Sequence, residues 1–154
     1  MLKKLFFILI VLNVLQGCGY SPMYSSNNKI FINIEEIILN GDLELNNYIK
    51  SSLKRYSSES ESEKYKININ TIYNKKSITK DSAGKTTNFL FEIETSMNLI
   101  STKINKNYVF KEKFTMENFE DKLVEKNYET SNKKNIANLI VNKLILQLSR
   151  LEWL

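Results

Sequence analysis

The sequence predicts an α+β fold, a two-layer sandwich in which a four-stranded, mainly antiparallel sheet carries two helices on one face. In four stretches apolar residues alternate with polar ones, which is the pattern of a strand with one buried face. In two others apolar residues recur every three or four positions, the spacing of an amphipathic helix. The stretches follow the order β-α-β-β-β-α. A sheet and helices that each have one apolar face bury those faces by stacking.

The first strand and the first helix are predicted from the segment that begins at Ile30. Every second residue from Ile30 to Ile34 is isoleucine, which indicates a strand. The turn sequence Asn40-Gly41-Asp42 follows, and its aspartate can cap the N-terminus of a helix. We therefore expect an amphipathic helix from Leu43 to Tyr56. Its apolar stripe consists of Leu45, Ile49, Leu53 and Tyr56.

Three further strands are predicted to form an antiparallel meander. They cover residues 65–73, 89–99 and 108–116, in which the apolar residues keep one parity. The polar segments 75–85 and 103–107 join them, and Asp81-Ser82-Ala83-Gly84 forms the tip of the first connection.

The last helix has the strongest helical pattern in the sequence. It is predicted to begin at Thr130 or Ser131, either of which can cap its N-terminus. The residues between the fourth strand and this cap are polar, so we expect a connecting segment there. The broad apolar stripe of the helix contains Ala137, Ile140, Val141, Leu144, Leu148 and Leu151.

The order of the elements predicts which connections share an end of the sheet. In a meander, the 75–85 hairpin and the segment 122–134 lie at one end, and the 103–107 turn lies at the other. The first helix returns the chain to the start of the second strand, so the first strand should run parallel to the second. The segment that precedes Ile30 is therefore expected to leave from the turn end, opposite the hairpin.

The N-terminus has the layout of a secretory signal that ends on a cysteine. Lys3 and Lys4 precede an apolar run from Leu5 to Leu15, and Leu15-Gln16-Gly17-Cys18 resembles the bacterial lipobox. Such signals are cut before the cysteine, whose thiol receives a diacylglycerol and whose new amine is acylated. We therefore expect a lipoprotein signal peptide at 1–17, a lipidated tether at 18–29 and a single α+β domain at 30–154.

Two other interpretations of this N-terminus stay open. The first is an uncleaved membrane anchor, but the apolar run is about eleven residues long, whereas a spanning helix needs about twenty. A simple secretory signal that is cut elsewhere would leave Cys18 as a free thiol. In each case the chain leaves the cytoplasm, and without a second cysteine the domain depends on packing for its stability.

The charge of the chain is mildly basic and dispersed. The formal net charge is +5, and removal of Lys3 and Lys4 with the signal leaves +3. Because lysines are mixed with acidic residues throughout and the chain is exported, nucleic acid is not an expected partner.

The residue types that carry most enzyme chemistry are missing. The chain has no histidine, and its one cysteine is assigned to lipid, so we expect no enzyme, no metal site and no cofactor. Ala83-Gly84-Lys85-Thr86 matches the end of a phosphate-binding loop, but the glycine that the motif requires is Thr79 and a strand follows. Four serine-x-x-lysine spacings occur without a second element of the penicillin-interacting enzymes, which indicates chance. Glu92 and Glu94 share a strand face, where solvated glutamates are common.

Lysines gather at the predicted hairpin end of the sheet. One interpretation is an ordinary solvated surface in a lysine-rich chain. The other is a contact for lipopolysaccharide, whose phosphates attract ammonium groups. The predicted contact residues are Lys75, Lys76, Lys80, Lys85, Lys122 and Lys126, with Lys133 and Lys134 nearby.

The N-terminal motif and the order of elements together resemble the lipopolysaccharide-assembly lipoprotein family LptE (RlpB-like), in its alphaproteobacterial form. The resemblance rests on Leu15-x-Gly17-Cys18-Gly19-Tyr20-x-Pro22-Met23-Tyr24 and on Tyr128-Glu129-Thr130 before the last helix. It implies a lipoprotein without enzyme activity, lipid-anchored on the periplasmic side of the outer membrane. There it would be the plug and partner of the barrel protein LptD and would assist lipopolysaccharide assembly. The alternative is a lipid carrier or envelope scaffold that faces the periplasm without a barrel partner.

Overall fold

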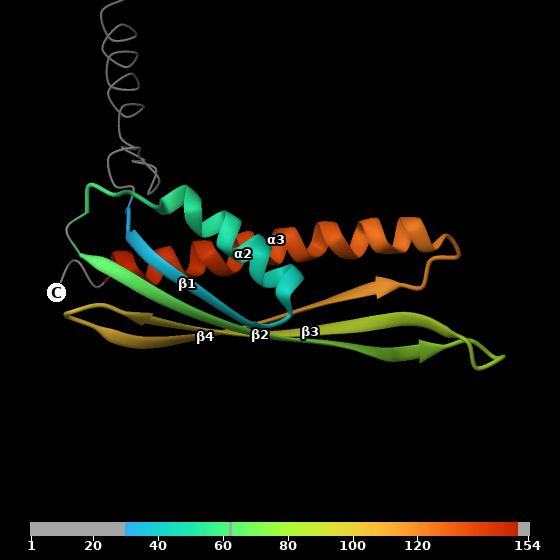
Figure 1. Cartoon of the computed structure of the whole chain (residues 1–154). Coiled ribbons are helices and arrows are strands. Elements are labelled where there is room, and N and C mark those ends of the chain that lie inside the picture. Colours follow the sequence, from blue (N-terminus) through green and yellow to red (C-terminus); the bar gives the residue numbers. More distant parts are fainter. Residues whose placement is uncertain (1–29, 62, 151–154) are drawn as a thin grey trace, which may run out of the picture.

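The computed structural model describes residues 30–61 and 63–150, so Cys18 and the predicted signal and tether lie outside the described residues. Within them the order β-α-β-β-β-α is confirmed (Figure 1). The elements are β1 (Asn33–Gly41), α2 (Leu43–Leu53), the short 3₁₀ helix η2 (Lys54–Tyr56), β2 (Lys64–Lys80), β3 (Thr86–Ile100), β4 (Asn105–Glu117) and α3 (Lys122–Ser149).

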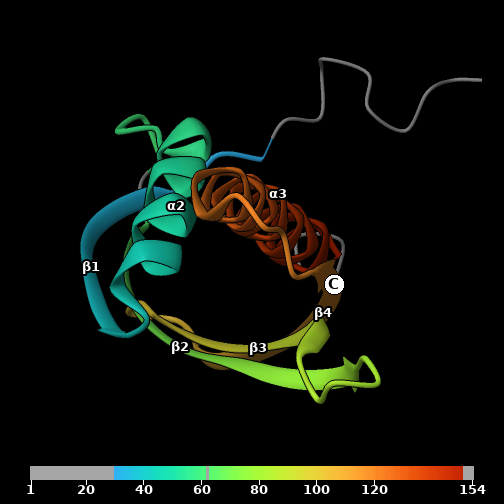
Figure 2. The ribbon, with the colours of Figure 1, turned by 90° about the vertical axis from the view of Figure 1, so that its right-hand side faces the viewer.

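The four strands form one sheet in the order β1-β2-β3-β4. β1 runs parallel to β2, and the other two pairs are antiparallel, as the sequence predicts. The sheet is curved, and both helices lie in its concave side (Figure 2). The predicted two-layer α+β sandwich is thus confirmed, and the opposite face of the sheet carries no helix within the described residues.

The core fills the space between the concave face of the sheet and the two helices. Phe91 is fully buried at its centre and stacks on Phe114, with ring centroids 4.4 Å apart and planes inclined by 3°. α2 and α3 also contact each other through polar groups, because the Ser52 hydroxyl donates to Asn138 Oδ1 at 2.6 Å. The fully buried aliphatic residues include Leu45, Ile49, Leu53, Ile67, Ile69, Met97, Leu99, Ile140, Val141 and Leu144.

β2 is longer than the predicted strand 65–73, because it continues to Lys80 and leaves only residues 81–85 as the hairpin tip. The prediction placed the whole 75–85 segment in a loop, since its residues are polar. The ladder with β3 continues nevertheless, with Lys75 opposite Phe91 and Ser77 opposite Phe89. The Lys75 ammonium lies over the face of the Phe89 ring, 4.2 Å from its centroid, so this polar residue is held on the inner side of the sheet by a cation–π contact.

The start of the last helix was also predicted wrongly. α3 begins at Lys122, and its N-cap is Asp121 rather than Thr130 or Ser131. The Asp121 carboxylate accepts hydrogen bonds from the backbone N–H groups of Leu123 at 2.8 Å and Val124 at 3.3 Å. The first two turns lack an apolar stripe, which is why the hydrophobic pattern begins only further along the helix.

The remaining boundaries differ by a few residues. β1 extends beyond the predicted 30–34 as far as Gly41, where it pairs with Thr71 of β2. The first helix is confirmed with Asp42 as its N-cap, although residues 54–56 form the 3₁₀ turn η2. The β3–β4 connection occupies residues 101–104, slightly earlier than the predicted 103–107.

Gly41 and Gly84 both have positive φ, of 83° and 79°, but only Gly41 is crowded. A Cβ on Gly41 would lie 2.1 Å from the Thr71 carbonyl oxygen, the atom that accepts the Asp42 N–H at 2.8 Å. A Cβ on Gly84 would meet no atom within 4 Å. The two alanine variants therefore share the backbone strain, about 1–2 kcal/mol, but not the clash.

We expect Gly41→Ala to lower the free energy of unfolding by about 1–3 kcal/mol more than Gly84→Ala, because the clash adds a packing cost to the common strain. Urea unfolding of both variants, followed by circular dichroism, measures the difference. Equal losses would mean that the backbone between β1 and α2 shifts enough to relieve the clash without a further loss of stability.

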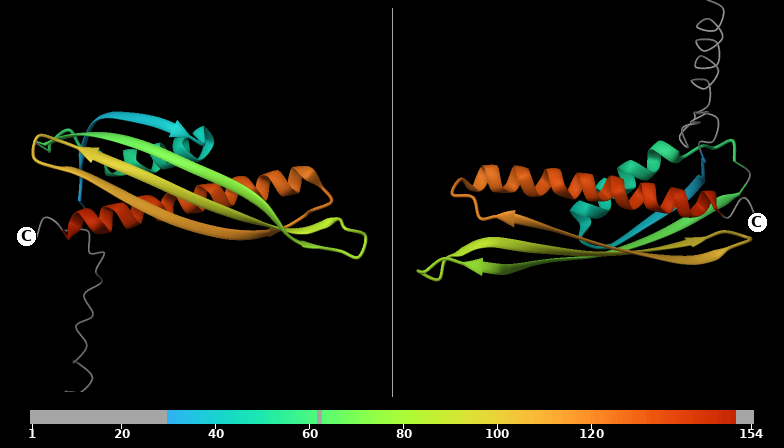
Figure 3. Two further views of the ribbon diagram at one scale, coloured as in Figure 1. Left: turned by 90° about the horizontal axis from the view of Figure 1, so that it is seen from below. Right: turned by 180° about the vertical axis from the view of Figure 1, so that it is seen from behind.

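The described chain begins at Ile30 at the same end of the molecule as the β3–β4 turn, while the 81–85 hairpin lies at the far end of the sheet (Figures 1 and 3). Asn33 pairs with Lys64 at the start of β2, and Ile100 pairs with Asn105 at the same end. The predicted direction of the chain is thus confirmed for the described residues. None of the helices among them is long and apolar enough to span a bilayer.

Candidate functional site

The two ends of the sheet hold the charged side chains that a ligand or surface could meet. We call the end with residues 81–85 the hairpin end and the end with residues 101–104 the turn end. The sequence predicts the lysine contact at the hairpin end and the lipid anchor beyond the turn end.

Two of the predicted lysines at the hairpin end meet on one carboxylate. Lys75 Nζ lies 2.9 Å from Glu125 Oε1 and 3.7 Å from Glu129 Oε2. Lys122 Nζ pairs with the other oxygen of Glu125. Hydrogen bonds from Lys122 and then Lys75 lower the pKa of Glu125, so this carboxylate stays ionised and neutralises charge that the prediction assigned to a ligand.

The other predicted lysines are dispersed around the same end. Lys76 lies on the helix-free face and pairs with Glu92. Lys80 and Lys85 flank the hairpin tip, which projects beyond the start of α3 (Figure 3). Lys126 lies on α3, and none of these last three lysines forms an ion pair within the described residues. The structure thus brings Lys75 and Lys122 together and leaves Lys80, Lys85 and Lys126 outside the ion pairs, although the charge of Lys126 helps to lower the pKa of Glu44.

A buried lysine that the sequence places near the predicted contact, but not among its residues, joins three elements. Lys133 is 6% exposed, and its Nζ lies 2.8 Å from Glu44 Oε2, 3.7 Å from Asp42 Oδ2 and 3.9 Å from Glu129 Oε1. It also lies 4.2 Å from the centroid of the Tyr73 ring, which connects α3 to β2. The hydrogen bond from Lys133 lowers the pKa of Glu44. A signal was present in the sequence, because Lys133 extends the apolar stripe of α3 by one helical step.

The polar seam between α3 and β2 has a structural role. The Tyr73 hydroxyl donates to Glu129 Oε1 at 2.8 Å, and burial raises the pKa of Tyr73 above its ordinary value. A surface hollow of about 210 Å³ lies beside this seam, lined by Glu44, Lys122, Glu125, Lys126, Glu129 and Thr130. Its mixed charges favour ion pairs over an added anion. Within the described residues no group of acidic side chains could hold a metal ion.

The segment that resembles a phosphate-binding loop and the glutamate pair both make contacts within the folded chain. Ala83-Gly84-Lys85-Thr86 lies at the hairpin tip, where Asp81 Oδ1 accepts the N–H groups of Ala83 and Lys85 at 2.9 Å each. Glu92 and Glu94 pair across the sheet with Lys76 and Lys111. These carboxylates form solvent-exposed ion pairs on the helix-free face of the sheet.

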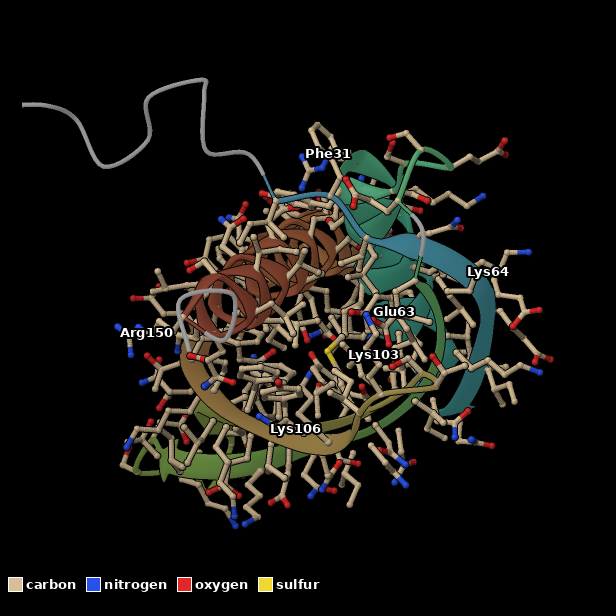
Figure 4. All side chains as sticks on the ribbon, turned by 90° about the vertical axis from the view of Figure 1, so that its left-hand side faces the viewer. Phe31, Glu63, Lys64, Lys103, Lys106 and Arg150 are labelled. Atoms are coloured by element: carbon tan, nitrogen blue, oxygen red, sulfur yellow. The ribbon has the colours of Figure 1, made fainter. Side chains whose placement is uncertain are left out.

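The turn end carries a different arrangement of charge (Figure 4). Lys103 Nζ lies 3.2 Å from Glu63 Oε2, while Glu63 Oε1 accepts the Ser101 hydroxyl and the Lys103 N–H. The hydrogen bond from Ser101 contributes most to the lowered pKa of Glu63. Lys64, Lys106 and Arg150 complete this end, and none of the three forms an ion pair in the described parts of the chain.

Comparison with known proteins places the fold among bacterial lipoproteins. No protein-family model matches the chain, and no curated protein matches its sequence. Among solved structures, rare lipoprotein B from Shewanella oneidensis is similar at a TM-score of 0.51 and 9% identity, covering 76% of this chain and 98% of that one. Lipoprotein B from Nitrosomonas europaea is similar at a TM-score of 0.53 and 12% identity, covering 79% and 86%.

A structure from Caulobacter crescentus, described as a lipoprotein, has a TM-score of 0.53 and 13% identity and covers 76% of this chain and 88% of that one. At these identities the likeness concerns the fold. It supports the resemblance to the LptE family that the N-terminal motif indicates. The chain therefore has the fold of the rare lipoprotein B (LptE-like) structures.

Proposed function

We propose that the chain is an outer-membrane lipoprotein of the LptE type, which acts as plug and partner of the LptD barrel in lipopolysaccharide assembly. Acyl chains on Cys18 hold it on the periplasmic side. The observation that carries the proposal is the fold that it shares with rare lipoprotein B over 76% of its length, in a chain with a lipobox-like N-terminus. In this role the protein is not an enzyme.

The helix-free face of the sheet supports a contact with a barrel wall. Asn68, Asn98 and Asn107 form a row across three strands of this face. Asn98 Oδ1 itself is buried and has no hydrogen-bond partner within the described residues. The interior walls of outer-membrane barrels are polar, which suits a face of amides. Exposed aliphatic residues on the same face are Ile38, Ile72 and Val109.

Lipopolysaccharide contact is proposed for the lysines at the hairpin end. Lys80, Lys85 and Lys126 form no ion pair within the described residues and can meet phosphates. Lys75, Lys76 and Lys122 would have to exchange their carboxylate partners. The hairpin end lies away from the anchored end, so these lysines would meet lipopolysaccharide beyond the point of attachment.

Copurification tests the proposal. We expect the tagged, acylated chain to bring a single outer-membrane barrel out of detergent extracts. Ile72→Glu should lower the recovered barrel about tenfold, a loss of about 1.4 kcal/mol, because it places a charge on the proposed contact face, where Ile72 is 51% exposed. The matched control Leu123→Glu changes a residue that is 67% exposed on α3.

The outcomes separate the candidate functions. A wild-type chain that brings no barrel would contradict the plug and favour the carrier or scaffold. A loss with Leu123→Glu and not with Ile72→Glu would keep the plug but move the contact to the helical layer. A carrier would need an apolar cavity, and the space between sheet and helices is filled by side chains such as Ile69, Leu99 and Leu144, which are fully buried.

A further inference from the structure

The first described residues are fixed to the turn end by backbone hydrogen bonds. The Ile32 N–H donates to the Tyr56 carbonyl at 2.9 Å, and the Ser58 N–H donates to the Ile32 carbonyl at 3.1 Å. Ile32 itself is buried. A tether that reaches the domain through Ile30 is therefore attached at a defined place on this end.

Cations share this end with the place of attachment, because several elements start or stop there. Lys64 is the first residue of β2, Lys103 lies in the β3–β4 turn, and Lys106 lies at the start of β4. Arg150 is the C-cap of α3, where the helix dipole favours a positive charge. Figure 4, which views the molecule along its long axis from this end, shows the four side chains spread across the end, with Phe31 at its rim.

In the ion pair of the turn end, the Glu63 side chain faces inward and the Lys103 side chain faces outward. The Glu63 side chain is 17% exposed, whereas that of Lys103 is 75% exposed. A surface that approaches this end therefore meets the ammonium group first. The adjoining segment after α2 is balanced, with Lys54 and Arg55 against Glu59 and Glu61. Phe31 is 40% exposed beside the start of the described chain and adds an apolar side chain to the same end.

We propose that the turn end, through Lys64, Lys103, Lys106 and Arg150, docks end-on against the anionic phospholipid headgroups of the leaflet that holds the acyl anchor. The inference rests on the lipid anchor of the proposed function. The segment 18–29 spans at most roughly 40 Å when fully extended, so the anchor keeps the turn end at a high local concentration near headgroups. Each basic residue near an anionic leaflet strengthens binding roughly fivefold.

The hairpin end does not offer the same surface. Several of its lysines share carboxylates, and the anchored segment begins at the opposite end of the sheet. β2 alone spans about 55 Å, given its 17 residues and a rise of about 3.3 Å per residue. End-on docking therefore directs the hairpin lysines away from the bilayer, into the periplasm, so this orientation is that of the anchored chain before it enters a barrel.

Lysine labelling on vesicles tests the docking. The acylated full-length mature chain is bound to vesicles in which a quarter of the phosphatidylcholine is replaced by phosphatidylglycerol, and to vesicles of phosphatidylcholine alone. Brief acetylation followed by mass spectrometry reports the reactivity of each lysine. We expect Lys64, Lys103 and Lys106 to react about threefold more slowly on the anionic vesicles, and about 1 M NaCl to abolish the difference. Lys80, Lys85 and Lys126 in the same sample should not change.

Two matched variants remove equal charge from opposite ends. In the triple variant Lys64→Gln, Lys106→Gln, Arg150→Gln, the anionic vesicles should no longer protect Lys103 from acetylation. In the triple variant Lys80→Gln, Lys85→Gln, Lys126→Gln, it should persist. All six positions are exposed and form no ion pair within the described residues, so both variants are expected to fold.

The other outcomes overturn the inference. Equal protection of both ends would mean that the domain lies flat, and protection of the hairpin lysines alone would reverse its orientation. Protection that appears only when lipopolysaccharide is added to the vesicles would assign the turn end to that ligand. The fraction of protein that floats with phosphatidylcholine vesicles reports the acyl anchor separately, so a missing anchor and an undocked domain give different results.

Discussion

Phe91→Ala is expected to lower the free energy of unfolding by about 3–5 kcal/mol, because it removes a large buried ring and leaves a cavity. Phe91 has no exposed surface and stacks on Phe114 at a centroid distance of 4.4 Å. It also contacts the rings of Tyr73 at 5.6 Å and Phe89 at 6.5 Å, so one substitution disrupts three aromatic contacts. Domains of this size are stabilised by about 5–15 kcal/mol, so the loss is a large share of the total.

Phe31→Ala provides the matched control for this substitution. The same ring is removed from a residue that is 40% exposed, and the expected change is within about 0.5 kcal/mol. Urea unfolding of the acylated chain in mild detergent, followed by far-ultraviolet circular dichroism, measures both variants. A loss below about 1 kcal/mol for Phe91→Ala would mean that the surrounding side chains collapse into the space.

Elements that are stabilised by residues close to them in the chain could be predicted from the sequence. Asp42 caps α2 because its carboxylate lies three residues before the N–H of Leu45, which donates to it at 2.8 Å. The parity of β3 and β4 follows from their alternating apolar residues, and the parallel pairing of β1 and β2 follows from the order of the elements. Each of these depends on neighbours in the chain or on topology alone.

The first part of α3 could not be predicted, because its stabilising partners lie far away in the sequence. Glu125 is held by Lys75, which is 50 residues earlier, and Glu129 by Tyr73, which is 56 residues earlier. The end of β2 belongs to the same set of contacts, since Lys75 covers the Phe89 ring and pairs with α3 at once. A polar segment that is ordered by tertiary ion pairs has no periodic signal in its own residues.

Ion-pair partners that are distant in sequence also explain why two of the predicted contact lysines are already paired in the structure. Topology places Lys75, Lys80, Lys85 and Lys122 at one end of the sheet, but it does not indicate which carboxylates meet them. Glu125 neutralises two of these lysines, and only the folded structure reveals this. Conversely, the turn end has few lysines close together in sequence, and its cations are gathered by the ends of separate strands and a helix.

Cys18→Ser should abolish acylation and release most of the protein from the membrane fraction. A serine hydroxyl does not replace the thiol that receives the diacylglycerol, and each buried methylene of an acyl chain contributes about 0.8 kcal/mol to anchoring. In the proposed function the acyl chains and the barrel contact hold the protein at the membrane, and a high-salt wash weakens the proposed contact with headgroups. Incorporation of labelled palmitate and fractionation after a high-salt wash measure the two effects.

The control for Cys18→Ser is Ser21→Ala, a substitution of similar size three residues further along, which should keep both acylation and retention. Palmitate that is still incorporated into the Cys18→Ser chain would contradict lipidation at this cysteine. A wild-type chain that carries no palmitate and whose N-terminus maps elsewhere would instead establish a simple secretory signal. A Cys18→Ser chain that loses palmitate but stays in the membrane fraction only while the barrel is present would show that the folded domain alone recognises its partner, and that the acyl chains chiefly bring it to the right surface.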